Sequence, residues 1–142
     1  MELMTVIAII SILTAVSIPG VFRWRANQQL NTSARQIQSV IQEMRLMAVK
    51  EQSRTQVVFD ATNNRLTTRI QIRGTAGGGW REVNHDMSPG IQITPAFNLV
   101  ADRVTFNSRG LPAESGEVTV TGGAGRKMRV VVSVTGIPRI EG

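Results

Sequence analysis

The first part of the chain is almost wholly apolar. From Leu3 to Phe22 no residue carries a charge, and Glu2 stands directly in front of this run. A helix of these 20 residues, rising ~1.5 Å per residue, spans ~30 Å, the thickness of the hydrocarbon core of a membrane. Pro19 and Gly20 lie within the run and should loosen or kink the helix. The pattern predicts a transmembrane half-helix over residues 1–22.

A second, amphipathic pattern follows the apolar run. Apolar or small residues recur at alternating steps of four and three, namely Leu30, Ala34, Ile37, Ile41, Met44 and Ala48. This spacing places them on one face of a helix, in a stripe that Val40 and Met47 widen. Because no strong helix breaker lies between Gly20 and Ser53, we predict one helix from about Leu3 to Ser53. Its amphipathic half covers residues 23–54.

The remaining residues, 55–142, have the pattern of a β domain. The runs rich in Val, Ile and Thr, several of which alternate between apolar and polar residues, are TQVVFD, RLTTRIQIR, IQIT, RVTF, EVTVTG and KMRVVVSVTG. Turn-forming segments separate them, at 62–64, 74–79, 88–90, 108–110 and 122–123. We therefore predict an α+β fold, in which the amphipathic half of a long N-terminal helix packs on an antiparallel β-sheet of about six or seven strands.

The charge of the chain is unevenly distributed. There are 16 Lys and Arg against 10 Asp and Glu, which gives a net charge of +6. All 16 basic residues and nine of the acids follow the apolar run, so this part carries about +7 by subtraction. Such a balance is compatible with nucleic acid or anionic lipid as a partner but does not require either. The absence of Cys excludes disulfides, thiolate catalysis and Cys-based metal sites.

The sequence gives little support for an enzyme. The single His, His85, lies in the segment Asn84-His85-Asp86, which we interpret as a polar surface turn without a nucleophile beside it. The glycine-rich segment 74–79 lacks the Gly-Lys-Ser/Thr ending of a phosphate-binding loop and reads as a hairpin loop. Metal-ligand spacing is absent. We therefore expect no catalytic residue, no cofactor and no metal site.

The start of the chain resembles the type IV pilin-like superfamily, whose mature subunits typically begin Phe-Thr-Leu-Ile-Glu-Leu and continue through an apolar helix to a Pro. Glu2 and the residues after it match this motif, and Pro19 stands 17 residues after Glu2, which is the family's spacing. Residues 104–112 resemble a Phe-x-x-x-Gly stretch of the GspH/FimT branch of minor pseudopilins and minor pilins. The ending Gly136-Ile137-Pro138-Arg139 resembles the branch's Gly-Arg-x-Arg, with Ile137 in place of the first Arg.

The resemblance implies a minor structural subunit of a type II secretion pseudopilus or a type IV pilus. It implies other pilins or pseudopilins as partners, and a single pass through the bacterial inner membrane with the C-terminal β domain in the periplasm. After assembly the subunit would lie at the tip or in the body of the filament, with residues 1–22 in the filament core. Glu2 and Pro19 are the predicted assembly residues.

Glu2 is the residue for which the resemblance implies a specific contact. An ionised carboxylate in apolar surroundings costs several kcal/mol unless it is paired. The implied partner is the N-terminal amine of the neighbouring subunit, which prepilin peptidase exposes by removing a short basic leader. Glu2 would then fix the register between subunits. The alternative is that Glu2 marks the water boundary of a plain membrane anchor.

The family's leader has no counterpart in this sequence. In the family, about four residues and a basic leader ending in Gly precede the acid, whereas here only Met1 does. We therefore expect the natural reading frame to extend upstream of Met1. Taken alone, Arg23 and Arg25 behind the apolar run would place the β domain in the cytoplasm, and a basic leader would reverse that orientation. A cleaved signal peptide is a further alternative.

DNA binding is the second function class. In FimT-like members the terminal Gly-Arg-x-Arg is tied to DNA capture during uptake, and the glycine-rich segment 122–129 is also basic. The candidate DNA-binding residues are Arg126, Lys127, Arg129 and Arg139, as phosphate contacts. Arg65, Arg69 and Arg73, which step by four and share one face of a strand, are the next candidates. The alternative is a solvated basic surface, because a charge of about +7 spread over a domain is not a focused patch.

Overall fold

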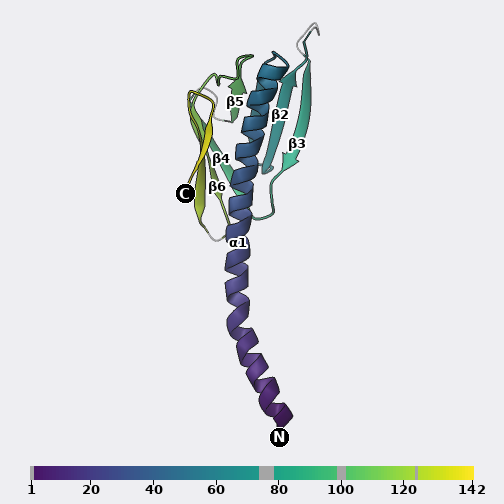
Figure 1. The fold of residues 1–142 in the computed structure, drawn as a ribbon, viewed down its shortest axis with the longest axis vertical. Coiled ribbons are helices and arrows are strands. Elements are labelled where there is room, and N and C mark those ends of the chain that lie inside the picture. The colour runs from purple at the N-terminus through teal and green to yellow at the C-terminus, as the bar shows by residue number, and fades with distance from the viewer. Residues whose placement is uncertain (1, 74–78, 99–101, 124) are drawn as a thin grey trace.

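The computed structural model describes residues 2–73, 79–98, 102–123 and 125–142. A single long helix, α1 (Glu2–Lys50), extends alone from the N terminus and then enters a β domain (Figure 1). This domain has two four-stranded antiparallel sheets, in the strand orders β3-β2-β1-β5 and β4-β6-β7-β8. The predicted α+β fold is confirmed.

The strands are β1 (Thr55–Asp60), β2 (Arg65–Gln71), β3 (Trp80–Asp86), β4 (Gln92–Phe97), β5 (Arg103–Phe106), β6 (Gly116–Thr121), β7 (Lys127–Val132) and β8 (Pro138–Glu141). In Figure 1, β2 and β3 lie on one side of α1 and β4 and β6 on the other, so the helix runs along both sheets. The rings of Phe59 and Phe97 stack with centroids 5.6 Å apart and join the two sheets.

The amphipathic half of α1 completes the core. All six residues of the predicted stripe are buried, together with Val40, whereas Met47 is half-buried. They pack among inward-facing side chains of both sheets, which include Val57, Phe106, Val118 and Val130. The stripe prediction is confirmed, and its partner is a pair of sheets rather than one.

Hydrogen bonds fix α1 on the domain at three heights. The buried Thr55 hydroxyl donates to the carbonyl of Met44 over 2.9 Å. The side-chain amide of Gln38 donates to the carbonyl of Pro138 over 3.2 Å. The Nε of Arg45 donates to the carbonyl of Gly110, also over 3.2 Å. These contacts reach β1, β8 and the β5–β6 loop, so the helix is tied to both sheets.

The apolar side chains near the start of α1 lie outside this core. Every apolar side chain of residues 3–14 is exposed, including Leu3, Ile7 and Ile12. Across the residues that the structure describes, no helix is both long and apolar enough to cross a membrane.

Helix α1 ends three residues before the predicted end at Ser53. Gln52 adopts a left-handed conformation with φ of 47°, and the backbone N–H of Ser53 donates to the carbonyl of Ala48 over 3.1 Å. A left-handed residue just beyond the last turn is a common way to end a helix, and here it turns the chain into β1.

Two of the eight strands were missed by the sequence pattern. Strand β3 contains Asn84-His85-Asp86, so the interpretation of this segment as a turn is wrong. It lies at a sheet edge with most side chains exposed, and an edge strand needs no apolar alternation. Strand β8 begins at Pro138, a position that a sheet-edge strand tolerates. The predicted loop at 74–79 falls outside the described residues except for Gly79.

A fragment that begins at Asn27 should be soluble and folded. It lacks the exposed apolar half of α1 but keeps every residue of the buried stripe. Gel filtration and circular dichroism measure the outcome. An insoluble or unfolded fragment would contradict the view that the stripe serves this domain rather than other subunits.

Gly110→Ala should destabilise the protein more than Gly90→Ala. Both glycines have positive φ, 73° and 79°, so each substitution should cost ~1–2 kcal/mol through the backbone. A Cβ at Gly110 would also lie 2.8 Å from Cγ2 of Val49, whereas one at Gly90 meets nothing within 4 Å. The crowding should add ~1–3 kcal/mol, visible as a lower thermal midpoint in detergent. Equal losses would contradict the close packing of this loop on α1.

Candidate functional site

The two predicted assembly residues lie far apart on α1. The helix begins at Glu2 and continues without interruption through Pro19. Pro19 stands 17 residues after Glu2, which at ~1.5 Å per residue corresponds to ~26 Å along the axis. The side chains of both residues lie outside the described part of the structure, so their role in assembly stays a prediction.

Two polar residues of the apolar segment after Glu2, Ser11 and Thr14, form their hydrogen bonds within the helix. The hydroxyl of Ser11 donates to the carbonyl of Ile7 over 2.8 Å, and that of Thr14 donates to the carbonyl of Ile10 over 2.7 Å. Both hydroxyls are therefore satisfied within the helix and demand no polar partner from outside.

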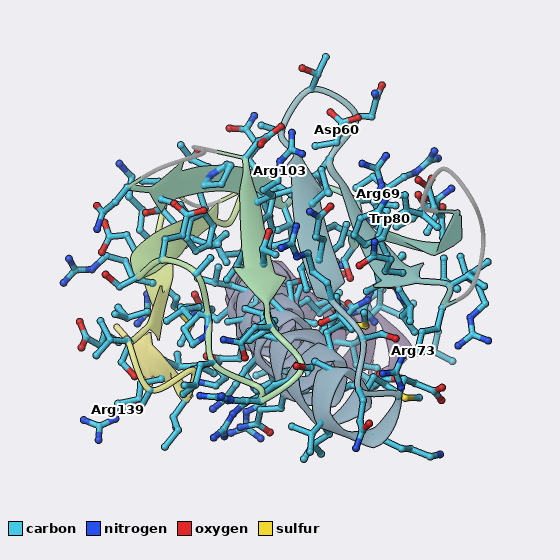
Figure 2. All side chains as sticks on the ribbon, turned by 90° about the horizontal axis from the view of Figure 1, so that it is seen from above. Asp60, Arg69, Arg73, Trp80, Arg103 and Arg139 are labelled. Carbon is cyan, nitrogen blue, oxygen red and sulfur yellow. The ribbon has the colours of Figure 1, made fainter. Side chains whose placement is uncertain are left out.

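The DNA-binding candidates lie on or beside the outer face of the second sheet. Lys127 and Arg129 alternate with inward-facing residues of β7, and Arg139 pairs with Val131 across to β8. Arg126 is exposed just before β7. Figure 2 shows Arg139 pointing away from the protein. Since Lys127 and Val131 are four strand residues apart, Lys127 and Arg139 are ~13 Å apart along the sheet.

Acidic residues divide this set of cations. Nη1 of Arg129 lies 3.5 Å from Oε2 of Glu117, and Nη2 lies 3.6 Å from Oε2 of Glu141. Arg129 thus stands between two carboxylates on the neighbouring strands. The structure brings three candidate cations to one face but compensates the central one, so the face lacks a focused positive charge.

The second group of cations is also largely paired. Arg65 and Arg69 share the outer face of β2, as their spacing predicts, and Arg73 is exposed beyond the strand's end. Nε of Arg65 lies 2.7 Å from Oδ1 of Asp86. Nε of Arg69 lies 2.7 Å from Oε1 of Glu82, an ion pair without hydrogen-bond geometry. In Figure 2, Arg69 and Arg73 lie well away from Arg139.

His85 lies on β3, with Nε2 3.4 Å from the hydroxyl of Thr68. Its neighbour Asp86 is held by Arg65. Within the described ranges, no cluster of three or more His, Cys, Asp or Glu residues could hold a metal ion. His85 and Asp86 are therefore part of the polar surface of the first sheet.

Asp60 has a structural role in the turn between β1 and β2. Its oxygens accept hydrogen bonds from the backbone N–H groups of Asn63 and Thr62 and from the side-chain amide of Asn63. The bond from the backbone of Asn63 contributes most to lowering the pKa of Asp60, followed by the bond from its side chain. Asp60 therefore closes the β1–β2 turn.

Sequence reasoning missed a groove at the end of α1. It has a volume of about 580 Å³ and is lined by Glu43, Arg45, Leu46, Met47, Val49, Lys50 and Arg109. The available signal was Leu46, which lies opposite the buried stripe and is exposed. A helix whose apolar stripe is already buried needs no Leu on its outer face.

Known proteins share this fold. No curated protein matches the chain by sequence. The minor pseudopilin EpsH from the type 2 secretion system of Vibrio cholerae superposes with a TM-score of 0.64 at 17% identity, covering 80% of this chain and 96% of EpsH. A type IV minor pilin, FimU of Pseudomonas aeruginosa, superposes with a TM-score of 0.62 at 14% identity, covering 82% of this chain and 90% of FimU. These likenesses show the fold.

The sequence itself shows the family. Residues 33–136 match the family described as Type II transport protein GspH. The match begins within the amphipathic half of α1 and extends through strands β1 to β7, and it covers most of the chain. The family and the two similar structures are those of structural pilins and pseudopilins, not of enzymes. The chain therefore belongs to the GspH family, within the GspH/FimT type of pilin-like proteins that its sequence resembles.

Proposed function

We propose that the chain is a minor structural subunit of a filament, either a type II secretion pseudopilus or a type IV pilus. The observation that carries the proposal is the contrast within α1 between the stripe buried by the β domain and residues 3–14, whose apolar side chains are all exposed. Bare apolar surface of this extent requires a partner. Lipid of the bacterial inner membrane would cover it before assembly, and the helices of other pilins or pseudopilins would cover it afterwards.

The two filament types share every feature of this proposal. The family description refers to type II transport, and EpsH belongs to a type 2 secretion system, whereas FimU is a type IV minor pilin. Gene neighbourhood distinguishes them, because secretion genes beside this one favour the pseudopilus and pilus or competence genes favour the pilus.

Glu2 gives the proposed assembly its register. It is the one charged residue in positions 1–22, and contacts between apolar helices have little directionality. In the proposed mechanism, prepilin peptidase exposes the N-terminal amine of each subunit, and Glu2 of the neighbour pairs with that amine. Pairing the two charges avoids the cost of an isolated ion in the filament core. The β domain would face the periplasm throughout.

DNA binding during uptake is the second candidate function. The exposed cations Arg126, Lys127 and Arg139 support it. Glu117 and Glu141 weigh against it, because they repel phosphates at the centre of the same face. Ile137 also replaces an Arg of the motif that carries DNA capture in the resemblance.

Glu2→Ala should reduce incorporation into filaments at least ~10-fold, because it leaves the neighbour's amine without a partner in apolar surroundings. Membrane insertion and folding of the β domain should be unchanged. The measurement is the amount of the chain in sheared filaments relative to the membrane fraction. Glu51→Ala is the control, since Glu51 is an exposed acid just beyond the same helix and does not line the groove at its end. Normal incorporation of Glu2→Ala would refute the pairing.

DNA binding should be weak or absent at ~50 mM salt, where phosphate contacts are strongest. The test is titration of the full chain in neutral detergent with a labelled duplex at several salt concentrations. Four phosphate contacts would give a log–log salt slope of about −3.6. A variant with Arg126, Lys127, Arg129 and Arg139 changed to Ala is the control.

Two outcomes would change this picture. Tight binding that is lost in the fourfold variant would favour the DNA-binding function. Tight binding that survives it would move the site toward Arg65, Arg69 and Arg73. If Glu117 and Glu141 suppress binding, the double variant Glu117→Gln, Glu141→Gln should bind more tightly than the unmodified chain.

A further inference from the structure

Figure 1 shows that α1 ends at the end of the β domain farthest from the N terminus. Several exposed apolar side chains belong to the last turns of α1 and to two neighbouring loops. We call them the distal surface: Leu46 (68% exposed), Val49 (48%), Leu111 (43%), Val134 (72%) and Ile137 (46%). They come from the last turns of α1, the β5–β6 loop and the β7–β8 turn. Single exposed apolar residues are ordinary, but several gathered on one end of a domain mark an interaction site.

Close contacts at Arg45 hold these three segments together. Its Nε donates to the carbonyl of Gly110. A Cβ at Gly136 would lie 3.1 Å from that same carbonyl oxygen and 3.4 Å from Nε of Arg45. A Cβ at Gly110 would meet Val49. Leu111 follows Gly110 and Ile137 follows Gly136, so the segments that carry them lie next to Arg45 and the last turns of α1.

The charges around this area are mostly positive. The groove at the end of α1 is lined by Arg45, Lys50 and Arg109, against the single acid Glu43. Arg109 is exposed and lies next to Gly110 in the β5–β6 loop. An apolar floor with a cationic rim complements an apolar side chain that is flanked by carboxylates.

We propose that the distal surface binds a neighbouring pilin-like subunit. The contact surface of that subunit would be acidic and would present an apolar side chain flanked by carboxylates. This inference rests on the proposed function as a filament subunit and adds the place and the chemistry of one contact. Ile137 has a role in it. At the position where the resemblance has an Arg, this chain offers apolar area for a protein in place of a cation for phosphate.

Other occupants fit less well. Leu46 lies 24 residues beyond Phe22, or ~36 Å along the helix axis, so lipid that covers the apolar half does not reach it. A second copy of this chain is a poor source of carboxylates. Five of its ten acids already lie in ion pairs with its own arginines, namely Glu82, Asp86, Asp102, Glu117 and Glu141.

The absence of Cys allows a direct test in cells that assemble the filament. Leu46→Cys and Ile137→Cys are made separately in the full chain, with Ala61→Cys in the exposed β1–β2 turn as the control. A membrane-impermeant maleimide is then applied to sheared filaments and to the unassembled membrane pool. In filaments, the cysteines of Leu46→Cys and Ile137→Cys should react at least ~10-fold more slowly than in the pool, as expected in an interface core. The control should react equally in both.

The outcomes separate this inference from the proposed function. Equal labelling of both distal cysteines in filaments and in the pool overturns the inference alone. Absence of the unmodified chain from filaments overturns the proposed function, and this inference with it.

A second experiment identifies the occupant. A photoreactive benzoylphenylalanine at position 46 of the full chain is activated in the same cells, and the attached peptide is sequenced by mass spectrometry. An acidic peptide of another pilin-like subunit supports the proposal, whereas a peptide of a second copy or of an unrelated protein overturns it. Arg109→Glu should lower incorporation and Arg109→Lys should preserve it. Equal incorporation of these two variants would contradict the proposal that the partner's contact surface is acidic.

Discussion

The packing of one helix against two sheets is the contact on which the rest of this structure depends. The stacked rings of Phe59 and Phe97 join the sheets, but the stripe from Leu30 to Ala48 fills the space along both of them. Full burial of a Leu or Ile side chain stabilises a fold by ~1.5–3 kcal/mol, so this stripe supplies a large share of the core. The same helix continues toward the N terminus into residues 3–14, whose apolar side chains are exposed, so one element joins the folded domain to the apolar segment.

The sequence predicted the elements whose pattern is local. The stripe repeats within a few residues, so its periodicity alone placed six side chains in the core, and all six are buried. Strand β3 has no such pattern, because its side chains face solvent along most of its length. Trp80–Asp86 is a strand because its backbone pairs with that of β2. Two ion pairs, Arg65–Asp86 and Arg69–Glu82, also connect the two strands. Those pairs join residues distant in sequence, and no local rule reveals them.

The DNA-binding candidates and the distal surface also depend on contacts between residues that are distant in sequence. Arg129 reads as a free cation in the sequence, but the strand register places Glu117 and Glu141 on either side of it. Leu46 and Ile137 are 91 residues apart, and long-range contacts of α1, such as those of Gln38 with Pro138 and of Arg45 with Gly110, bring their segments together. Sequence composition therefore reports how much charge and apolar area a chain has, whereas the fold decides which charges are compensated and which apolar residues gather.

The length of α1 gives the two ends of the molecule different partners. Leu46 stands 44 residues beyond Glu2, which corresponds to ~66 Å along the helix axis. A contact at Glu2 and a contact at the distal surface are therefore too far apart to share a single small domain of a neighbour, and we expect them to engage different subunits. Apolar helix contacts alone do not discriminate among neighbours, because they lack direction. The contact at Glu2 and the contact at the distal surface each involve defined charges, and one helix joins them. Together they specify the position of the subunit in a filament more precisely than either contact would alone.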